Sequence, residues 1–102
     1  MVYNSQMIEI RETGDFSDWF AALSDAQART RIQARILRLR SGNAGDLKPV
    51  GEGVSELRID YGAGYRVYFV QHGKVLIILL AGGTKRSQSK DIRLALSLAR
   101  DI

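Results

Sequence analysis

The chain has 102 residues, of which 45% are hydrophobic and 25% are charged, and it contains no cysteine. A chain of this length buries enough surface for a single core, so we expect one domain over residues 1–102. The lack of cysteine excludes disulfides, zinc fingers and thiol nucleophiles, and the longest apolar run, residues 75–81, is too short to cross a bilayer. With no signal-like start, these features predict a cytoplasmic protein that does not enter the membrane.

The formal net charge of +4 is unevenly distributed. The first 28 residues hold five acidic and one basic residue, whereas the other 74 hold fourteen basic and six acidic residues and carry +8. A basic body of this kind attracts nucleic acid through counterion release, although a charged surface also keeps a protein soluble. Charge alone therefore leaves both interpretations open.

The first half of the chain predicts a strand followed by two helices. Residues 7–11 alternate weakly, as in a strand. Asp15 is positioned to cap a helix, and Ser24-Asp25 offers a cap for a second one. The apolar residues of the two helices recur at the spacing of one helical face: Phe16, Trp19, Phe20 and Leu23, then Ala28, Ile32, Ile36 and Leu39. The second helix carries five arginines on its other faces, and residues 41–45 end it.

The second half predicts three antiparallel strands and a final helix. From Glu56 the period changes to two, which gives strands over residues 56–61, 65–70 and 75–80 with turns at 62–64 and 71–74. Residues 81–84 are expected to break the third strand, and Ser89 to cap the last helix, whose apolar face is Ile92, Ala95, Leu96 and Ala99, with Leu94 and Leu98 apart. The order strand, two helices, three strands, helix indicates a small α+β domain with its helices packed on one face of the sheet.

Three motifs in this order resemble the RelE/ParE toxin superfamily. They are Glu56-Leu57-Arg58, then Gly64-Tyr65-Arg66-Val67-Tyr68-Phe69, then Leu79-Leu80-Ala81-Gly82-Gly83-Thr84-Lys85, and Gln88, Asp91, Ile92 and Ala95 continue the match into the last helix. The nearer likeness is to the HigB-like, phage-derived branch of addiction module killer proteins. It runs from about residue 8 to residue 98.

The resemblance implies the toxin of a type II toxin–antitoxin module. Its expected activity is ribosome-dependent mRNA endoribonuclease cleavage through the RNA 2′-hydroxyl, with no metal and no cofactor, which inhibits translation. The expected partners are the ribosome, mRNA and an antitoxin with a helix-turn-helix DNA-binding domain. Another branch of the superfamily poisons DNA gyrase, and a toxin fold that survives only as a binding protein is a third possibility, because fold does not fix function.

The residues themselves predict a cationic face. Arg58, Arg66 and Tyr68 alternate with core residues, and Lys85 follows the third strand, so these groups could line one side of the sheet. Carried over from the family, Arg66 is expected to stabilise the phosphate with Arg58 and Lys85 (or Arg86) beside it, and Tyr68 to stack on a base or bind phosphate. We expect further RNA contacts from Arg86, Lys48, Lys90, Arg35 and Arg38.

Two alternatives apply to these side chains, and one role is left open. Arg66 could instead pair with Asp60 across the hairpin, and the arginines of the second helix could form a solvated face. No tyrosine or histidine follows Lys85, which leaves the general acid and base unassigned. A lysine among these cations could act as base, and Asp91 could substitute in part for the missing residue.

Overall fold

The computed structural model describes residues 8–102. Its strands are β1 (Glu9–Glu12), β2 (Leu47–Gly51), β3 (Val54–Ile59), β4 (Tyr65–His72) and β5 (Leu76–Thr84). Its helices are α1 (Gly14–Ala22), α2 (Ala26–Arg40), the 3₁₀ turn η1 (Lys85–Ser87) and α3 (Gln88–Arg100). The strands form one sheet in the order β1-β5-β4-β3-β2, in which β1 runs parallel to β5 and all other neighbours are antiparallel.

The α+β class is confirmed, and the first three elements follow the sequence pattern closely. Of the first predicted strand, residue 7 lies outside the described residues. The first helix is capped by Thr13, whose side chain accepts a hydrogen bond from the Phe16 backbone N–H, so the expectation for Asp15 is wrong. Asp25 caps α2 as predicted, accepting from the N–H groups of Gln27 and Ala28.

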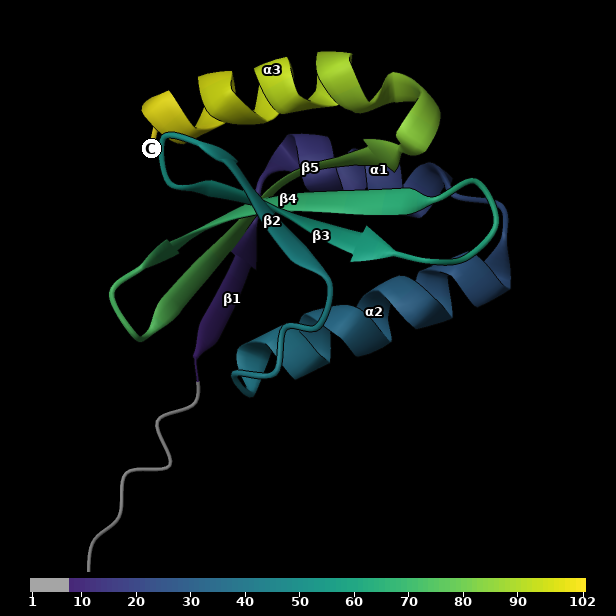
Figure 1. Cartoon of the computed structure of the whole chain (residues 1–102), viewed down its shortest axis with the longest axis horizontal. Coiled ribbons are helices and arrows are strands. Elements are labelled where there is room, and N and C mark those ends of the chain that lie inside the picture. Colours follow the sequence, from purple (N-terminus) through teal and green to yellow (C-terminus); the bar gives the residue numbers. More distant parts are fainter. Residues whose placement is uncertain (1–7) are drawn as a thin grey trace, which may run out of the picture.

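The helices lie on both faces of the sheet, which corrects the expectation of one covered face. Residues of α1 and α2 pack with the inward side chains of β3, β4 and β5 in one core cluster. A second cluster on the opposite face joins α3 to Val54, Tyr68, Val70 and Leu80. Figure 1 shows α3 and α2 on opposite sides of the sheet. The reason is that β3 to β5 carry apolar side chains on both faces, so each face requires a cover.

The final helix begins earlier than expected. Gln88 is its first residue, so Ser89 lies inside α3 and does not cap it. Ala95 is buried and Leu98 packs into the second cluster, while Leu94 stays 38% exposed.

Strand β2 is absent from the sequence-based order. It pairs with β3 at the edge of the sheet, and its register is irregular between Pro49 and Gly51. The turn that joins β2 to β3 places Glu52 and Gly53 at positive φ. An edge strand tolerates proline because one side of its backbone has no strand partner. Because β2 contains Pro49 and Gly51, its sequence does not show the pattern that predicts a strand.

The glycine pair at 82–83 continues β5, although it was expected to end the strand. A Cβ atom on Gly82 would lie 2.2 Å from the Trp19 ring, and one on Gly83 would lie 1.7 Å from the Asp91 carboxylate. The two glycines therefore allow α1 and α3 to approach the strand from opposite faces.

No helix among residues 8–102 is both long enough and apolar enough to cross a membrane.

Candidate functional site

An open groove of about 420 Å³ lies where the β3–β4 turn, the segment before β2 and the end of β5 meet. Its charged lining residues are Arg58, Arg66, Lys85, Asp46 and Asp60. The face of the sheet beneath α3 is therefore divided into an apolar part that the helix covers and a cationic part beyond the start of the helix. The structure thus brings together three of the four predicted catalytic residues.

The two arginines lie directly opposite each other on neighbouring strands, since Arg58 of β3 pairs with Arg66 of β4 in the register. The carboxylate of Glu56, which is fully buried, accepts a hydrogen bond from Arg58 Nε at 2.8 Å and lies 3.9 Å from Arg66 Nη1. Arg66 therefore forms an ion pair with Glu56, which corrects the alternative in which it pairs with Asp60. The Arg66 side chain is 11% exposed, and its Nε has no hydrogen-bond partner among residues 8–102.

Lys85 reaches the groove from the end of β5. Its backbone N–H donates to the Gly64 carbonyl at 2.8 Å, so the β3–β4 turn holds the first residue of η1 in place. A Cβ on Gly64, whose φ is +77°, would lie 3.3 Å from Lys85 Cβ. Glycine at this turn therefore accommodates both the positive φ and the close approach of Lys85.

Tyr68 does not reach the groove. It is fully buried and its hydroxyl donates to Glu56 Oε2 at 2.9 Å. Burial and the neighbouring carboxylate raise the pKa of Tyr68 above its usual range, so the phenol stays protonated. This corrects the expectation that Tyr68 stacks on a base, because its ring contacts the core that α3 covers.

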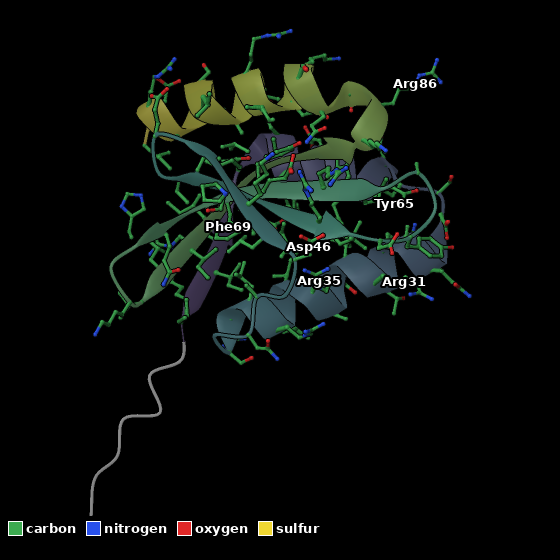
Figure 2. The ribbon with its side chains drawn as sticks, in the orientation of Figure 1. Arg31, Arg35, Asp46, Tyr65, Phe69 and Arg86 are labelled. Atoms are coloured by element: carbon green, nitrogen blue, oxygen red, sulfur yellow. The ribbon has the colours of Figure 1, made fainter. Side chains whose placement is uncertain are left out.

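Two of the predicted RNA contacts lie next to the groove. Arg86 and Lys90 are exposed at the start of α3, where they line a second hollow with Arg93, and Lys85 lines both hollows. Figure 2 shows Arg86 extending away from the body of the protein. Lys48 is exposed on β2 and pairs in register with Glu56, which places it on the same face of the sheet as Arg58.

Arg35 differs from these exposed cations because it is half-buried and hydrogen-bonded to the backbone. Its guanidinium donates to the backbone carbonyls of Arg58, Ala44 and Asp46, and burial lowers its pKa. Figure 2 shows Arg35 between α2 and the segment at Asp46. These carbonyls engage both of its terminal nitrogens and turn the guanidinium toward the protein, which argues against the expected RNA contact. Arg38, by contrast, is exposed on α2 and stays a prediction.

The buried hydrogen-bond network around Glu56, which lies beneath the groove, was not predicted from the sequence. Glu56 accepts a third hydrogen bond from Gln88 Nε2 at 2.8 Å, which links the start of α3 to the two arginines. Burial opposes the ionisation of Glu56, but the hydrogen bonds from Arg58, Gln88 and Tyr68 outweigh it, and the pKa lies below its usual value. The signal in the sequence was an acidic residue two positions before Arg58 on the same strand face.

Asp91 is also buried and accepts a hydrogen bond from the Ser87 hydroxyl. It packs against Gly83, and it is not among the residues that line the groove. Arg58, Arg66 and Lys85 can therefore bind and polarise a phosphate in the groove. The carboxylates that line the groove are those of Asp46 and Asp60.

Comparison with known proteins places the chain in a family and identifies its fold. The chain belongs to the same family as an uncharacterized protein of Haemophilus influenzae, to which it is 48% identical over 95 residues, 93% of this chain and 96% of the relative. No protein-family model matches it.

The fold is that of the toxin RelE. A mutant of E. coli toxin RelE in the free state matches with a TM-score of 0.70 over 89% of this chain and 96% of the other, at 13% sequence identity. The RelE-like fold expected from the motifs is therefore confirmed.

Proposed function

We propose that this protein is the toxin of a type II toxin–antitoxin module and acts as a ribosome-dependent mRNA endoribonuclease. The observation that carries the proposal is the groove into which β3, β4 and η1 each contribute one cation, Arg58, Arg66 and Lys85. The RelE-like fold supports the same class of protein.

The chemistry that suits this groove is attack by the RNA 2′-hydroxyl on the adjacent phosphate. The new P–O2′ bond forms as the P–O5′ bond breaks, which leaves a 2′,3′-cyclic phosphate and a free 5′-hydroxyl. A guanidinium binds two phosphate oxygens at once, so Arg58 and Arg66 would stabilise the charge that develops on them. Both side chains line the groove, Arg58 with 30% and Arg66 with 11% of its side-chain surface exposed.

The two proton transfers need a base for the 2′-hydroxyl and an acid for the departing 5′-oxygen. Asp46 and Asp60 are the carboxylates that line the groove, and Lys85 is the ammonium group that lines it. We assign the base to one of these carboxylates and the acid to Lys85. This assignment needs neither a metal nor a cofactor.

The partners in this proposal are the ribosome, mRNA and an antitoxin with a helix-turn-helix DNA-binding domain, and the location is the cytoplasm. Arg86, Lys90 and Lys48 would bind RNA outside the groove, since they are exposed next to it or on the same sheet face. Within the superfamily, the motifs around Arg58 and Arg66 favour the HigB-like branch.

The decisive experiment maps new RNA 5′ ends across the transcriptome after brief induction. The wild type is expected to create ends in phase with codons, and Arg66→Ala to reduce them by about 100-fold or more, because one preorganised donor to the transition state is lost. Lys74→Ala is the matched control, since it removes one exposed cation from the β4–β5 turn and leaves the groove unchanged.

Each other outcome points to a named alternative. Growth arrest with intact mRNA and induction of the DNA-damage response would identify a gyrase poison. No arrest by a folded wild type would identify a binding protein that retains the fold. Undiminished cleavage by a folded Arg66→Ala variant would remove Arg66 from the site.

A further inference from the structure

Glu56 is buried directly beneath the groove and interacts with two of its cations. Its two carboxylate oxygens have different partners. Oε1 accepts from Arg58 Nε at 2.8 Å and lies 3.9 Å from Arg66 Nη1, whereas Oε2 accepts from Tyr68 at 2.9 Å and Gln88 at 2.8 Å. One oxygen therefore holds the groove arginines while the other is fixed by the core and by α3.

Fold stability alone does not account for a charge at this position. A buried ion pair is weak evidence of a stabilising role, because well-packed apolar residues of similar volume often replace such groups without loss of stability. Val54 and Val70 on the same sheet face belong to the second core cluster, so the carboxylate lies at the border between that apolar core and the groove. The buried carboxylate is thus explained better by what it does to its partners.

The effect on Arg58 is specific. Two arginines opposite each other on adjacent strands repel, and a carboxylate between them reduces that repulsion. Because Glu56 occupies the Arg58 Nε, the two terminal nitrogens remain as donors, and the side chain, which is 30% exposed, lines the groove. A guanidinium held at Nε presents its terminal nitrogens in one fixed direction.

We propose that Glu56 is a positioning residue for the cleavage reaction, and that it acts by fixing the orientation of the Arg58 guanidinium in the groove. This rests on the proposed function. Glu56 itself does not contact RNA, since it is fully buried.

The test separates the rate of cleavage from the affinity for RNA. Glu56→Gln is expected to lower the single-turnover cleavage rate on mRNA-programmed ribosomes by about 10- to 100-fold, because the Arg58 orientation is lost. Its affinity for a short RNA with 2′-O-methyl groups, which cannot be cleaved, is expected to stay the same or to rise, because a negative charge beneath two arginines has been removed.

Two further sets of variants distinguish positioning from a general structural role. Gln88→Ala and Tyr68→Phe each remove a partner of Oε2 and leave the contact between Oε1 and Arg58, so they should slow cleavage by less than about threefold. In an Arg58→Ala background, Glu56→Gln should have almost no additional effect, because both changes remove one interaction. Additive losses, or a loss of affinity equal to the loss of rate, would overturn the proposal.

Two measurements keep the proposal testable if a variant unfolds or if no RNA is cleaved. Glu56→Asp keeps the charge but withdraws the carboxylate, and it should retain more activity than Glu56→Gln; equal activity would contradict positioning. The Arg58 Nε–H resonance in the NMR spectrum should exchange slowly with water in the wild type and rapidly in Glu56→Gln. Because that signal does not depend on cleavage, it tests Glu56 even if the proposed activity is wrong, and equal exchange in both proteins would reject the role.

Discussion

The acid sensitivity of the folded protein should depend in part on the carboxylate of Glu56. Its pKa is lowered from the ordinary value of 4.5, because hydrogen bonds from Arg58, Gln88 and Tyr68 outweigh the cost of burial. A group whose pKa is lower in the folded state contributes stability above its unfolded pKa and loses it as the pH falls through the folded value. This contribution is therefore present at neutral pH and declines below about pH 4.5.

Glu56→Gln is expected to make the free energy of unfolding less dependent on pH in this acidic range. The slope should fall by up to about 1.4 kcal/mol per pH unit, the value for one proton. Urea unfolding of both proteins between pH 2 and 7 measures it. The slope cannot vanish, since hydrogen bonds from Ala28 and Tyr61 also lower the pKa of Asp25, and that group stays. Parallel pH curves for the two proteins would contradict the assignment.

At the scale of elements, α3 docks on β5 through a contact that only glycine allows. The Asp91 carboxylate lies where a Cβ of residue 83 would be, at 1.7 Å, and Asp91 also accepts a hydrogen bond from Ser87. This contact fixes the start of α3, and the start of α3 in turn supplies Gln88 to Glu56. The residues that α3 covers do not line the groove. The groove still depends on this helix, because the start of α3 holds Gln88 against Glu56 beneath the groove.

Gly83→Ala should destabilise the fold by about 1–3 kcal/mol, the usual effect of overpacking. Adding Asp91→Ala removes the closest clash and leaves only Ser87 Oγ at 2.9 Å, so the double variant should lose less stability than the sum of the two single changes. Thermal and urea unfolding of the four proteins measures the coupling. Gly73→Ala is a matched control in the β4–β5 turn, where a Cβ meets nothing within 4 Å but φ is +62°, so it reports the backbone strain alone.

At the scale of the whole molecule, the basic residues form two connected groups. Lys85 lines both the groove with Arg58 and Arg66 and the hollow with Arg86 and Lys90. A strand of RNA that follows both would release counterions from each phosphate contact, so binding should weaken steeply with salt.

The logarithm of the affinity for an uncleavable single-stranded RNA is expected to fall linearly with the logarithm of the salt concentration. Lys90→Ala should reduce the size of this slope by about 0.7, the value for one phosphate contact. Lys74→Ala, in the turn between β4 and β5, should leave it unchanged. Fluorescence anisotropy at several salt concentrations measures both, and equal slopes for wild type and Lys90→Ala would place RNA elsewhere.

Pattern alone was sufficient for much of the fold. The spacing of Phe16 and Phe20, and of Ala28 and Ile32, predicted the two helices that form the first core cluster. The alternation of Val67 and Phe69 with Arg66 and Tyr68 predicted which side chains share a sheet face. Both follow from local periodicity, which depends only on backbone geometry.

Periodicity does not show which helix packs on each face of the sheet. The sequence placed Glu56, Arg58, Arg66 and Tyr68 on one face of the sheet. The position of α3 decided which of these side chains are buried. Glu56 and Tyr68 lie in the interior, whereas Arg58 lines the groove. Likewise, α2 lies so close to the segment before β2 that Arg35 donates to its carbonyls instead of to solvent. The sequence by itself thus determined the three α-helices, four of the five strands of the described residues, the sheet faces and the three groove cations. The tertiary structure alone decided the pairing of β2 and which side chains are buried, because both depend on contacts between segments far apart in the chain.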